Sequence, residues 1–350
     1  MFWIRADGNE MIGAGHLMRC MTVAQEFAEL WGRENINFMC ADSRSGEMAE
    51  EAGFRAYVLN TDYRNMESEL PIWARILMDP SGEPDPAGNM ILVDSYYVTD
   101  RYLSALRGFG RTVLLDDLGH RVRPVDCVVN YNVFADVEQY HRLYRGTDVR
   151  LLIGSEYVPV RRQFRDREYR VKETPMAALI TTGGGDVDNI GGRILERLCR
   201  DKMEFYLVTG RFNPHLQELQ KLAESSDNIH IRHDVKDMAG LMEKCDIAVT
   251  AGGSTVYELA AVGVPFVCFS YAENQEPLVE YIGTSNIAGA AGMWHKDPEG
   301  TLERIADIFE KLLKDPEMRQ SFHRREKRMV DAGGATRLAD RLGREFLSSQ

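Results

Sequence analysis

Residues 4–19 read IRADGNEMIGAGHLMR and contain, in order, the parts of a strand, a turn and a helix. The apolar residues Phe2 to Ile4 predict a short first strand. From Met18 to Leu30 apolar residues recur at helical spacing, which predicts a helix that starts near His16. The loop between them has glycines at positions 8, 13 and 15, and glycine permits tight turns and close approach of the backbone to a ligand.

His16 lies at the predicted start of this helix, where free backbone N–H groups form an anion site. The positive end of a helix disfavours an imidazolium ion, so we expect a neutral His16 that can act as a general base. Arg5, Asp7 and Arg19 are close in sequence. An ordinary turn between a strand and a helix can have the same glycines, but a histidine with these charged neighbours favours a functional site.

The composition indicates a globular protein of two domains. Its 350 residues exceed a typical single core, 44% of them are hydrophobic and 27% are charged. The formal net charge of −12 argues against a nucleic-acid binder or a binder of anionic membranes, because both need a basic face. No apolar stretch approaches the length of about 20 residues that spans a membrane.

The six cysteines show no paired CxxC spacing. Several lie in apolar runs, such as Phe266 to Phe269 around Cys268, which is typical of a buried strand. We therefore expect reduced thiols, a cytoplasmic protein and no zinc site. We expect no other metal and no cofactor either. Because the opening motif begins three residues after the start, we expect no leader before it, and we expect no protein partner.

Strands and helices alternate along the first 155 residues, which predicts a doubly wound parallel sheet. Strands are predicted at 36–41, 56–59, 90–95, 112–117 and 125–132, helices at 43–53, 64–78 and 99–108, and an exposed Pro- and Gly-rich loop at 79–89. Because the carboxyl ends of parallel strands share one edge, we expect Asp94, Asp117 and Asn130 on a rim with His16.

A second alternating unit is predicted at 176–335. Its strands are expected at 176–182, 205–210, 229–231, 247–250 and 265–270, and its helices at 189–198, 213–224, 238–244, 256–262 and 302–314. Residues 311–328 predict a solvated face of mixed charge. The charged segment 156–175 is expected to be a solvated linker helix, and a last helix within 336–350 can pack back onto the first domain. The prediction is thus an α/β protein of two Rossmann-like, doubly wound domains that face a shared cleft.

Two Gly-rich turns mark the second domain. Gly183-Gly184-Gly185-Asp186 indicates a sharp turn or a close approach of the backbone. Gly252-Gly253-Ser254-Thr255 offers N–H groups and hydroxyls to a phosphate, and Glu258, one helical turn on, can accept both hydroxyls of a ribose. The alternative is that Ser254 or Thr255 only caps the helix and that Glu258 is an exposed acid. Asn274-Gln275 follows the next strand and favours ligand binding.

These motifs resemble those of a known group of proteins. The sequence GGSTVYELAAVGVP at 252–265, with AENQ at 272–275, resembles the nucleotide-sugar site of MurG-like GT-B proteins. The opening motif from Arg5 to Arg19 is more particular and resembles the PseG-type UDP-sugar hydrolases of pseudaminic acid biosynthesis and the related SpsG group. The resemblance covers most of the chain, including Asp116-Asp117, Asn130 to Asn132 and Gly183 to Gly185.

The resemblance implies a GT-B fold and hydrolysis of UDP-2,4-diacetamido-2,4,6-trideoxy-β-L-altropyranose, in the biosynthesis of nonulosonic acids used for flagellin glycosylation. His16 would activate water for inverting C–O cleavage at the anomeric carbon, without a metal. Gly253, Ser254 and Glu258 would hold UDP, with the glutamate on the ribose. Asn274 and Gln275 would contact the sugar or the phosphates. From its proximity in sequence, Asp7 is a candidate to orient His16 or the water. The other candidates for substrate binding are Arg5, Gly13, Gly15, Arg19, Asp117, Asn130, Gly184 and Thr255.

Three other functions fit the same fold. A GT-B glycosyltransferase would use the same donor site, but the short loops around His16 indicate no groove for a lipid or polymer acceptor, and no basic amphipathic patch is evident. A non-catalytic nucleotide-sugar binder would not need His16 at a helix start. A UDP-sugar 2-epimerase would need acidic residues that are not evident here. The extra length at 64–89 leaves the identity of the sugar open.

Overall fold

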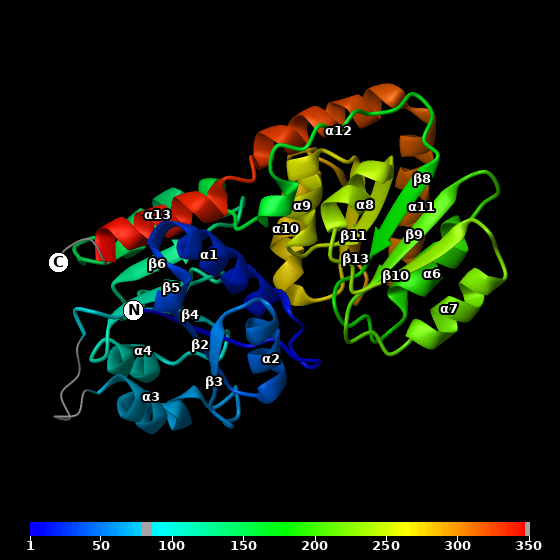
Figure 1. The fold of residues 1–350 in the computed structure, drawn as a ribbon. Helices are drawn as coiled ribbons and strands as arrows, with labels where there is room; N and C mark the ends of the chain where they lie inside the picture. Colours follow the sequence, from blue (N-terminus) through cyan, green and yellow to red (C-terminus); the bar gives the residue numbers. More distant parts are fainter. Residues whose placement is uncertain (79–85, 347–350) are drawn as a thin grey trace. The chain divides into compact units, whose positions relative to one another are not determined.

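Two parallel β-sheets organise the chain, one in each of two units (Figure 1). The computed structural model describes residues 1–78 and 86–346. The first unit comprises residues 1–159 together with the C-terminal residues from Gly333, and the second comprises residues 160–332. The last helix, α13 (Gly334–Phe346), packs against α1 (Gly15–Trp31), so the prediction that it returns to the first domain is confirmed.

The described residues of the first unit form a seven-stranded parallel sheet in the order β3-β2-β1-β4-β5-β6-β7. The strands are β1 (Phe2–Ala6), β2 (Ile36–Cys40), β3 (Arg55–Val58), β4 (Met90–Asp94), β5 (Arg111–Leu115), β6 (Cys127–Asn130) and β7 (Arg150–Ile153). The chain runs from β1 to β3 on one side and resumes at β4 on the other, so the strand order reverses between β1 and β4. Ligands of doubly wound sheets bind at the carboxyl ends of the strands at such a reversal.

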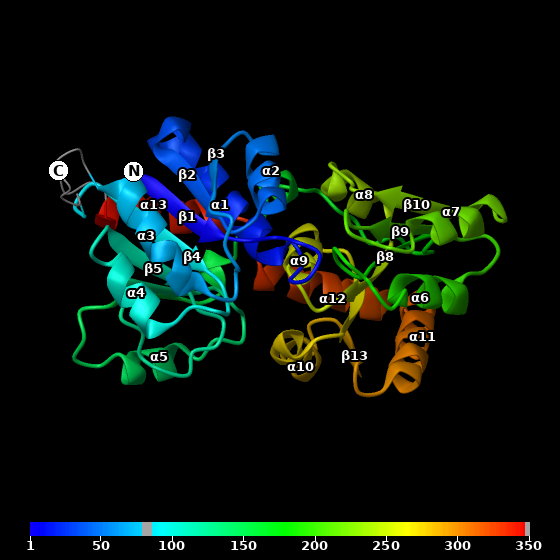
Figure 2. The ribbon, with the colours of Figure 1, turned by 90° about the horizontal axis from the view of Figure 1, so that it is seen from below.

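Helices cover both faces of this sheet (Figure 2). α1 and α13 pack on one face, and α3 and α4 pack on the other. The helices of this unit, besides α1 and α13, are α2 (Ser43–Glu51), α3 (Leu70–Leu77), α4 (Asp100–Leu106) and α5 (Val137–Leu143), with 3₁₀ turns η1 (Arg33–Asn35), η2 (Met66–Glu69) and η3 (Ser155–Tyr157). Strands β1, β2, β4 and β6 are buried along their whole length, as expected for strands that are covered on both faces.

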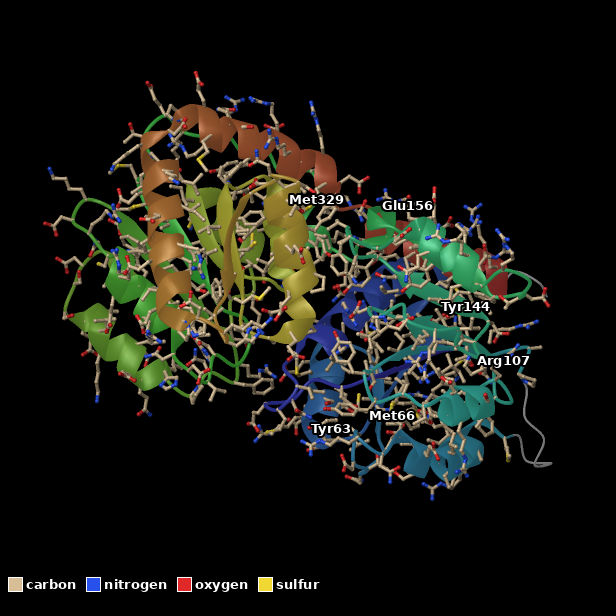
Figure 3. All side chains as sticks on the ribbon, turned by 180° about the vertical axis from the view of Figure 1, so that it is seen from behind. Tyr63, Met66, Arg107, Tyr144, Glu156 and Met329 are labelled. Carbon is tan, nitrogen blue, oxygen red and sulfur yellow. The ribbon has the colours of Figure 1, made fainter. Side chains whose placement is uncertain are left out.

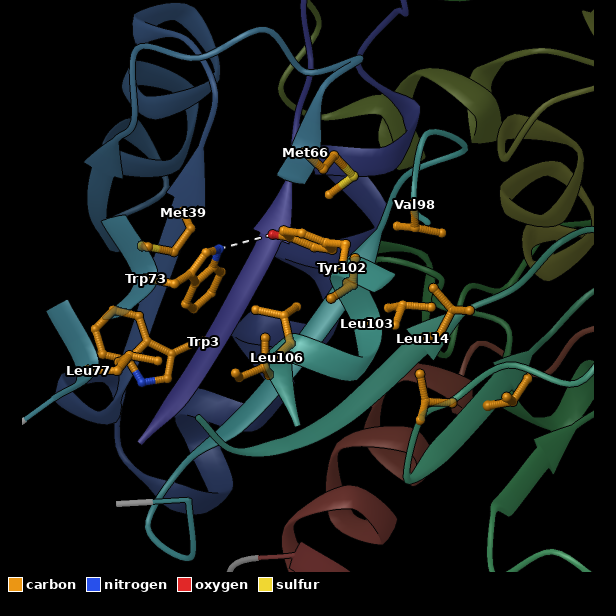
Figure 4. Packing of buried hydrophobic residues seen from close by; sticks show 14 of the residues in the cluster. Trp3, Met39, Met66, Trp73, Leu77, Val98, Tyr102, Leu103, Leu106 and Leu114 are labelled. Carbon is orange, nitrogen blue, oxygen red and sulfur yellow. Dashed lines mark hydrogen bonds between the residues drawn. The ribbon is translucent and has the colours of Figure 1, made fainter. Parts of the chain in front are cut away.

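The core beneath α3 and α4 is aromatic and includes polar partners (Figure 4). Met66 and Tyr144 of this core are labelled among all the side chains in Figure 3. The Trp73 indole N–H donates to the Tyr102 hydroxyl at 2.9 Å, and that hydroxyl donates to Glu69 Oε2 at 2.9 Å. All three side chains are fully buried. Buried tryptophan and tyrosine usually find such partners. These hydrogen bonds therefore join η2 and α3 to α4 within the buried core.

The described residues of the second unit form a six-stranded parallel sheet in the order β10-β9-β8-β11-β12-β13. The strands are β8 (Ala177–Thr181), β9 (Glu204–Thr209), β10 (Ile229–His233), β11 (Ile247–Ala251), β12 (Phe266–Ser270) and β13 (Gly289–Met293). The helices are α6 (Ile190–Leu198), α7 (Leu216–Glu224), α8 (Met238–Lys244), α9 (Thr255–Val262), α10 (Glu276–Thr284), α11 (Pro298–Lys314) and α12 (Pro316–Met329), with 3₁₀ turns η4 (Arg162–Phe164) and η5 (Glu273–Gln275). α6 and α11 pack on one face, and α8 and α9 on the other (Figure 2). Here the strand order reverses between β8 and β11.

Two expectations about charged segments are wrong. Residues 156–175 contain no α-helix; they hold the end of η3 and all of η4, and Phe164 and Tyr169 of this segment are buried. The face at 311–328 is only partly solvated, because Arg319 and Glu326 of α12 are buried. In both segments, buried residues between the exposed charged ones pack the segment onto the second unit.

Part of the predicted loop at 79–89 lies outside the described residues, namely 79–85. Within the described ranges, none of the helices combines the length and the apolar character that a bilayer span requires. Over the same ranges, no cluster of three or more His, Cys, Asp or Glu side chains has an arrangement suited to a metal ion. The six cysteines are free thiols, and all except Cys199 are buried.

Candidate functional site

His16 lies in the first turn of α1, directly after the glycine loop that the sequence predicts. Gly13 has a φ of +72°, a conformation that side chains disfavour, which explains the glycine there. Asn9 fixes the preceding turn, because its Oδ1 accepts hydrogen bonds from the N–H groups of Met11 and Ile12. No side chain caps α1 within the described residues. The helix start thus presents His16 beside backbone N–H groups.

Asp94, at the carboxyl end of β4, is the hydrogen-bond partner of His16. The distance from His16 Nδ1 to Asp94 Oδ1 is 2.6 Å, and Asp94 is buried. Burial alone would raise the pKa of Asp94, but the charges and hydrogen bonds of Arg19 and His16 outweigh it and hold that pKa well below its usual range. Arg19 Nη2 also lies 3.1 Å from His16 Nδ1. Because a carboxylate can only accept, the shorter contact with Asp94 is a hydrogen bond from Nδ1–H, and in that tautomer Nε2 is the acceptor.

Arg19 is enclosed by this cluster. Its Nε and Nη2 donate to the two oxygens of Asp94, each at 2.5 Å. Its Nη1 donates to Asp117 at 2.8 Å and to the Tyr131 hydroxyl at 2.6 Å. The guanidinium therefore holds two carboxylates in place, and its fixed fork is bonded within the protein. The expectation that Arg19 binds substrate stays a prediction.

Tyr96 completes the surroundings of His16, and the sequence analysis did not single it out. Its ring meets the His16 ring edge-on, with centroids 4.6 Å apart, and its hydroxyl donates to Asp117 at 3.1 Å. Tyr96 is 41% exposed. The signal that could have found it is its place two residues after Asp94, at the carboxyl end of β4.

Asn130 is hydrogen-bonded within the first unit, and its expected role in substrate binding stays a prediction. Its side chain is buried, accepts from the N–H and the side chain of Asn132, and donates to Tyr140. Asn132 in turn donates to Asp117 at 3.0 Å. The predicted rim of Asp94, Asp117 and Asn130 does exist, but Asp94 and Asp117 are the members that reach the Arg19 cluster.

Asp7 and Arg5 form a separate buried pair, which corrects the expectation that Asp7 orients His16. Arg5 donates to Asp7 and to both oxygens of Glu69, and Asp7 also accepts from the backbone N–H of Ala41. Arg5 is fully buried and Asp7 is 3% exposed. These residues join β1, β2 and η2 at the base of the loop.

The turn after β11 is built from backbone. Gly252 must be glycine because a Cβ there would lie 2.6 Å from Val279 Cγ2, whereas a Cβ at Gly253 would meet nothing within 4 Å. Ser254 stands at the N-cap of α9 but makes no capping hydrogen bond with its side chain, and it is exposed. The capping alternative therefore fails for Ser254. The N–H groups of Gly252 and Gly253 already donate to the carbonyls of Phe269 and Ala251. Thr255 begins the helix and is half-buried.

Glu258 is buried, so the alternative of an exposed acid is wrong. Arg161 Nε donates to its Oε1 at 2.8 Å. Gln275 is also buried, and its Oε1 accepts from the N–H of Tyr271, while Asn274 is exposed. Gly184 lies against Gly210, where a Cβ would come within 2.4 Å of the Gly184 Cα. The close backbone approach that was predicted for the glycine triplet therefore includes a contact between Gly184 and Gly210 of the same chain.

Comparison with known proteins identifies relatives of both halves. Residues 190–336 match the glycosyltransferase family 28 C-terminal domain. The chain is 23% identical over 283 residues to the UDP-2,4-diacetamido-2,4,6-trideoxy-beta-L-altropyranose hydrolase of Campylobacter jejuni, a match that covers 79% of this chain and 94% of that protein. It is 25% identical over 229 residues to the spore coat polysaccharide biosynthesis protein SpsG of Bacillus subtilis, covering 63% of this chain and 65% of that protein. The predicted resemblance to the PseG and SpsG group is confirmed.

Among solved structures, Acinetobacter baumannii MurG has a similar fold. The TM-score is 0.66 at 12% identity, with 98% of this chain and 99% of MurG covered. At this identity the likeness concerns the fold alone. Together with the two parallel sheets, it establishes the predicted GT-B α/β fold of two Rossmann-like units.

Proposed function

We propose that this chain is a nucleotide-sugar hydrolase that converts UDP-2,4-diacetamido-2,4,6-trideoxy-β-L-altropyranose into UDP and the free sugar, a step in nonulosonic acid biosynthesis. The observation that carries the proposal is the hydrogen bond between His16 Nδ1 and the ionised Asp94 at the start of α1. The similarity to the Campylobacter jejuni hydrolase supports it and supplies the substrate class.

In this proposal His16 is the general base. Asp94 fixes the tautomer, so Nε2 accepts a proton from a water molecule while the water oxygen attacks the anomeric carbon. The bond between that carbon and the oxygen of UDP breaks, the electron pair leaves with UDP, and the anomeric configuration inverts. UDP is a good leaving group, so a base and donors to the diphosphate are sufficient.

The second unit would hold the nucleotide. The open backbone at Gly253 and the exposed hydroxyl of Ser254, at the start of α9, suit a phosphate group. Glu258 would accept hydrogen bonds from the ribose hydroxyls. Asn274 would contact the sugar or the phosphates, and Gln275 would hold the loop that presents it, since its side chain already bonds to Tyr271.

Proton NMR of the protein with this UDP-sugar, without any acceptor, tests the proposal. We expect UDP and free sugar to appear together in wild-type protein, with the first-formed anomer inverted, and neither to appear with His16→Ala. Binding of the UDP-sugar without turnover would contradict a hydrolase.

The second candidate is a glycosyltransferase. It is favoured by the match of residues 190–336 to the glycosyltransferase family 28 C-terminal domain. A transferase would release UDP slowly with water alone and rapidly once an acceptor hydroxyl is supplied, so the same NMR assay with and without candidate acceptors separates the two.

A further inference from the structure

Residues 160–175, called the strap here, lie along the second unit as an ordered segment. Phe164 is fully buried, and η4 packs against α8 and α9. Gln163 accepts from the N–H of Ala239 at 3.1 Å and donates to the Lys236 carbonyl at 3.2 Å. Arg167 pairs with Glu243 at 3.1 Å. The strap is thus attached at several points to the start and the body of α8.

The strap presents Arg161 to the proposed nucleotide site. Arg161 Nε donates to Glu258 Oε1 at 2.8 Å, and its guanidinium lies over the Phe164 ring, 5.0 Å from the centroid. The Arg161 and Glu258 side chains are 25% and 11% exposed. Because Phe164 is buried and fixed, it supports the guanidinium plane in one position.

We propose that Arg161 is a positioning residue for nucleotide recognition: it holds the Glu258 carboxylate in the orientation that receives the ribose hydroxyls of a nucleoside diphosphate. The proposal rests on the assignment of Glu258 to ribose. A carboxylate has about four acceptor positions on its two oxygens, so one bond from Arg161 leaves capacity for two hydroxyls.

The physical reason is preorganisation. A glutamate on a helix has several rotamers, and a carboxylate that must first be ordered loses binding free energy to the ligand. The bond from Arg161 orders Glu258 before the nucleotide arrives and compensates its charge within a largely buried site. Arg161 does not need to contact the ligand for this effect, because it acts through Glu258. Its contribution to nucleotide affinity should therefore depend on the presence of the ribose hydroxyls.

The experiment compares UDP with 2′,3′-dideoxy-UDP, which has the same base and phosphates but no ribose hydroxyls. Dissociation constants are measured by calorimetry for wild-type protein, Arg161→Gln, Glu258→Gln and the double variant. Arg170→Gln is the matched control, because it removes the same charge from an exposed position of the strap. We expect Arg161→Gln to weaken UDP about 3- to 10-fold and to leave dideoxy-UDP unchanged. The double variant should be no weaker than Glu258→Gln alone.

Each other outcome has a definite meaning. An equal loss of affinity for UDP and dideoxy-UDP would show that Arg161 acts on the base or the phosphates, which overturns the inference. An unchanged affinity of Arg161→Gln for UDP, when Glu258→Gln is weakened, overturns it as well and leaves the ribose assignment intact. Unchanged UDP binding by Glu258→Gln removes the ribose assignment itself. Binding of dideoxy-UDP also reports that each variant is folded.

Discussion

The two helix starts that follow the reversal points of the sheets differ in construction. Around His16, in the first unit, charged side chains bond to one another: Asp94 to His16 and Arg19, and Arg19 to Asp117. At the start of α9, in the second unit, the turn consists of glycines and an exposed serine. The first site is a network of bonded side chains. The second is a backbone turn with open space beside Gly253.

This difference matches two kinds of task. A proton transfer needs one side chain in a defined tautomer, which only fixed partners can provide. Recognition of a phosphate needs backbone N–H groups, and glycines leave the space that lets a phosphate approach them. The network should therefore be sensitive to the loss of single polar groups, and the backbone turn to the addition of single carbon atoms.

The largest effect is expected from His16→Ala. Loss of the general base should lower kcat on the proposed UDP-sugar by about 10²- to 10⁴-fold. UDP affinity should change little, because the proposed nucleotide contacts belong to the second unit. Steady-state kinetics and calorimetry with UDP measure the two quantities. A parallel loss of UDP affinity would break the division of tasks between the units.

The next effect separates two buried acids of the first unit. Asp94→Asn should lower kcat about 10²-fold or more, because an amide no longer fixes the His16 tautomer. Asp7→Asn is the matched control: its bonds go to Arg5 and to Ala41, so we expect it to lower the melting temperature with a smaller change in kcat. If Asp7→Asn lost more activity than Asp94→Asn at a temperature where both are folded, the orienting role would return to Asp7.

The sequence allowed the sheets and the rim to be predicted because these depend on local patterns. An apolar run that ends in an acid predicts both β4 and the place of Asp94. The partner of His16 could not be predicted in this way, since His16 and Asp94 are 78 residues apart and meet only because β1 and β4 are neighbours. Proximity in sequence favoured Asp7, whose side chain the structure directs to Arg5.

Elements with weak local signals were missed or misread. α5 is short and polar, and β13 (GAAGM) contains none of the β-branched or aromatic residues that mark a strand. The strap has enough charge to resemble a solvated linker, yet Phe164 anchors it. Arg19 was predicted near the site, but sequence does not reveal that its donors are already used by Asp94, Asp117 and Tyr131.

A third prediction contrasts neighbouring glycines of the backbone turn. Gly253→Ala adds a methyl group to open space, so the melting temperature should stay unchanged while UDP affinity falls about tenfold through obstruction of the phosphate position. Gly252→Ala places a Cβ against Val279 and should destabilise the protein by about 1–3 kcal/mol. Calorimetric unfolding and UDP titration give both values. Equal UDP affinities for wild type and Gly253→Ala would remove the phosphate from this turn.

The smallest effect concerns pH and compares one buried acid from each unit. The pKa of Asp94 is depressed, so its contribution to stability is present above the pKa of an unfolded aspartate, about 3.9, and is lost as the pH falls towards its folded value. Glu326 of α12 is fully buried, and burial raises its pKa well above the usual value. Its stabilising, protonated form is complete below about pH 4.3 and is lost as the pH rises.

Glu326→Gln keeps the shape of the side chain and removes this titration. We expect the variant to melt at the wild-type temperature near pH 4 and a few degrees above it near pH 8, because only the wild type must then ionise or retain a proton inside the core. Asp94→Asn should behave differently: its deficit should be nearly constant from about pH 8 to pH 5 and should shrink only as the pH falls below about 4. Scanning calorimetry from about pH 3 to pH 8 compares the variants. A Glu326→Gln difference that stays constant across this range would mean that Glu326 is not the titrating group. The contrast with Asp94 would then fail, because the second unit would lack a buried acid whose pKa is raised by burial.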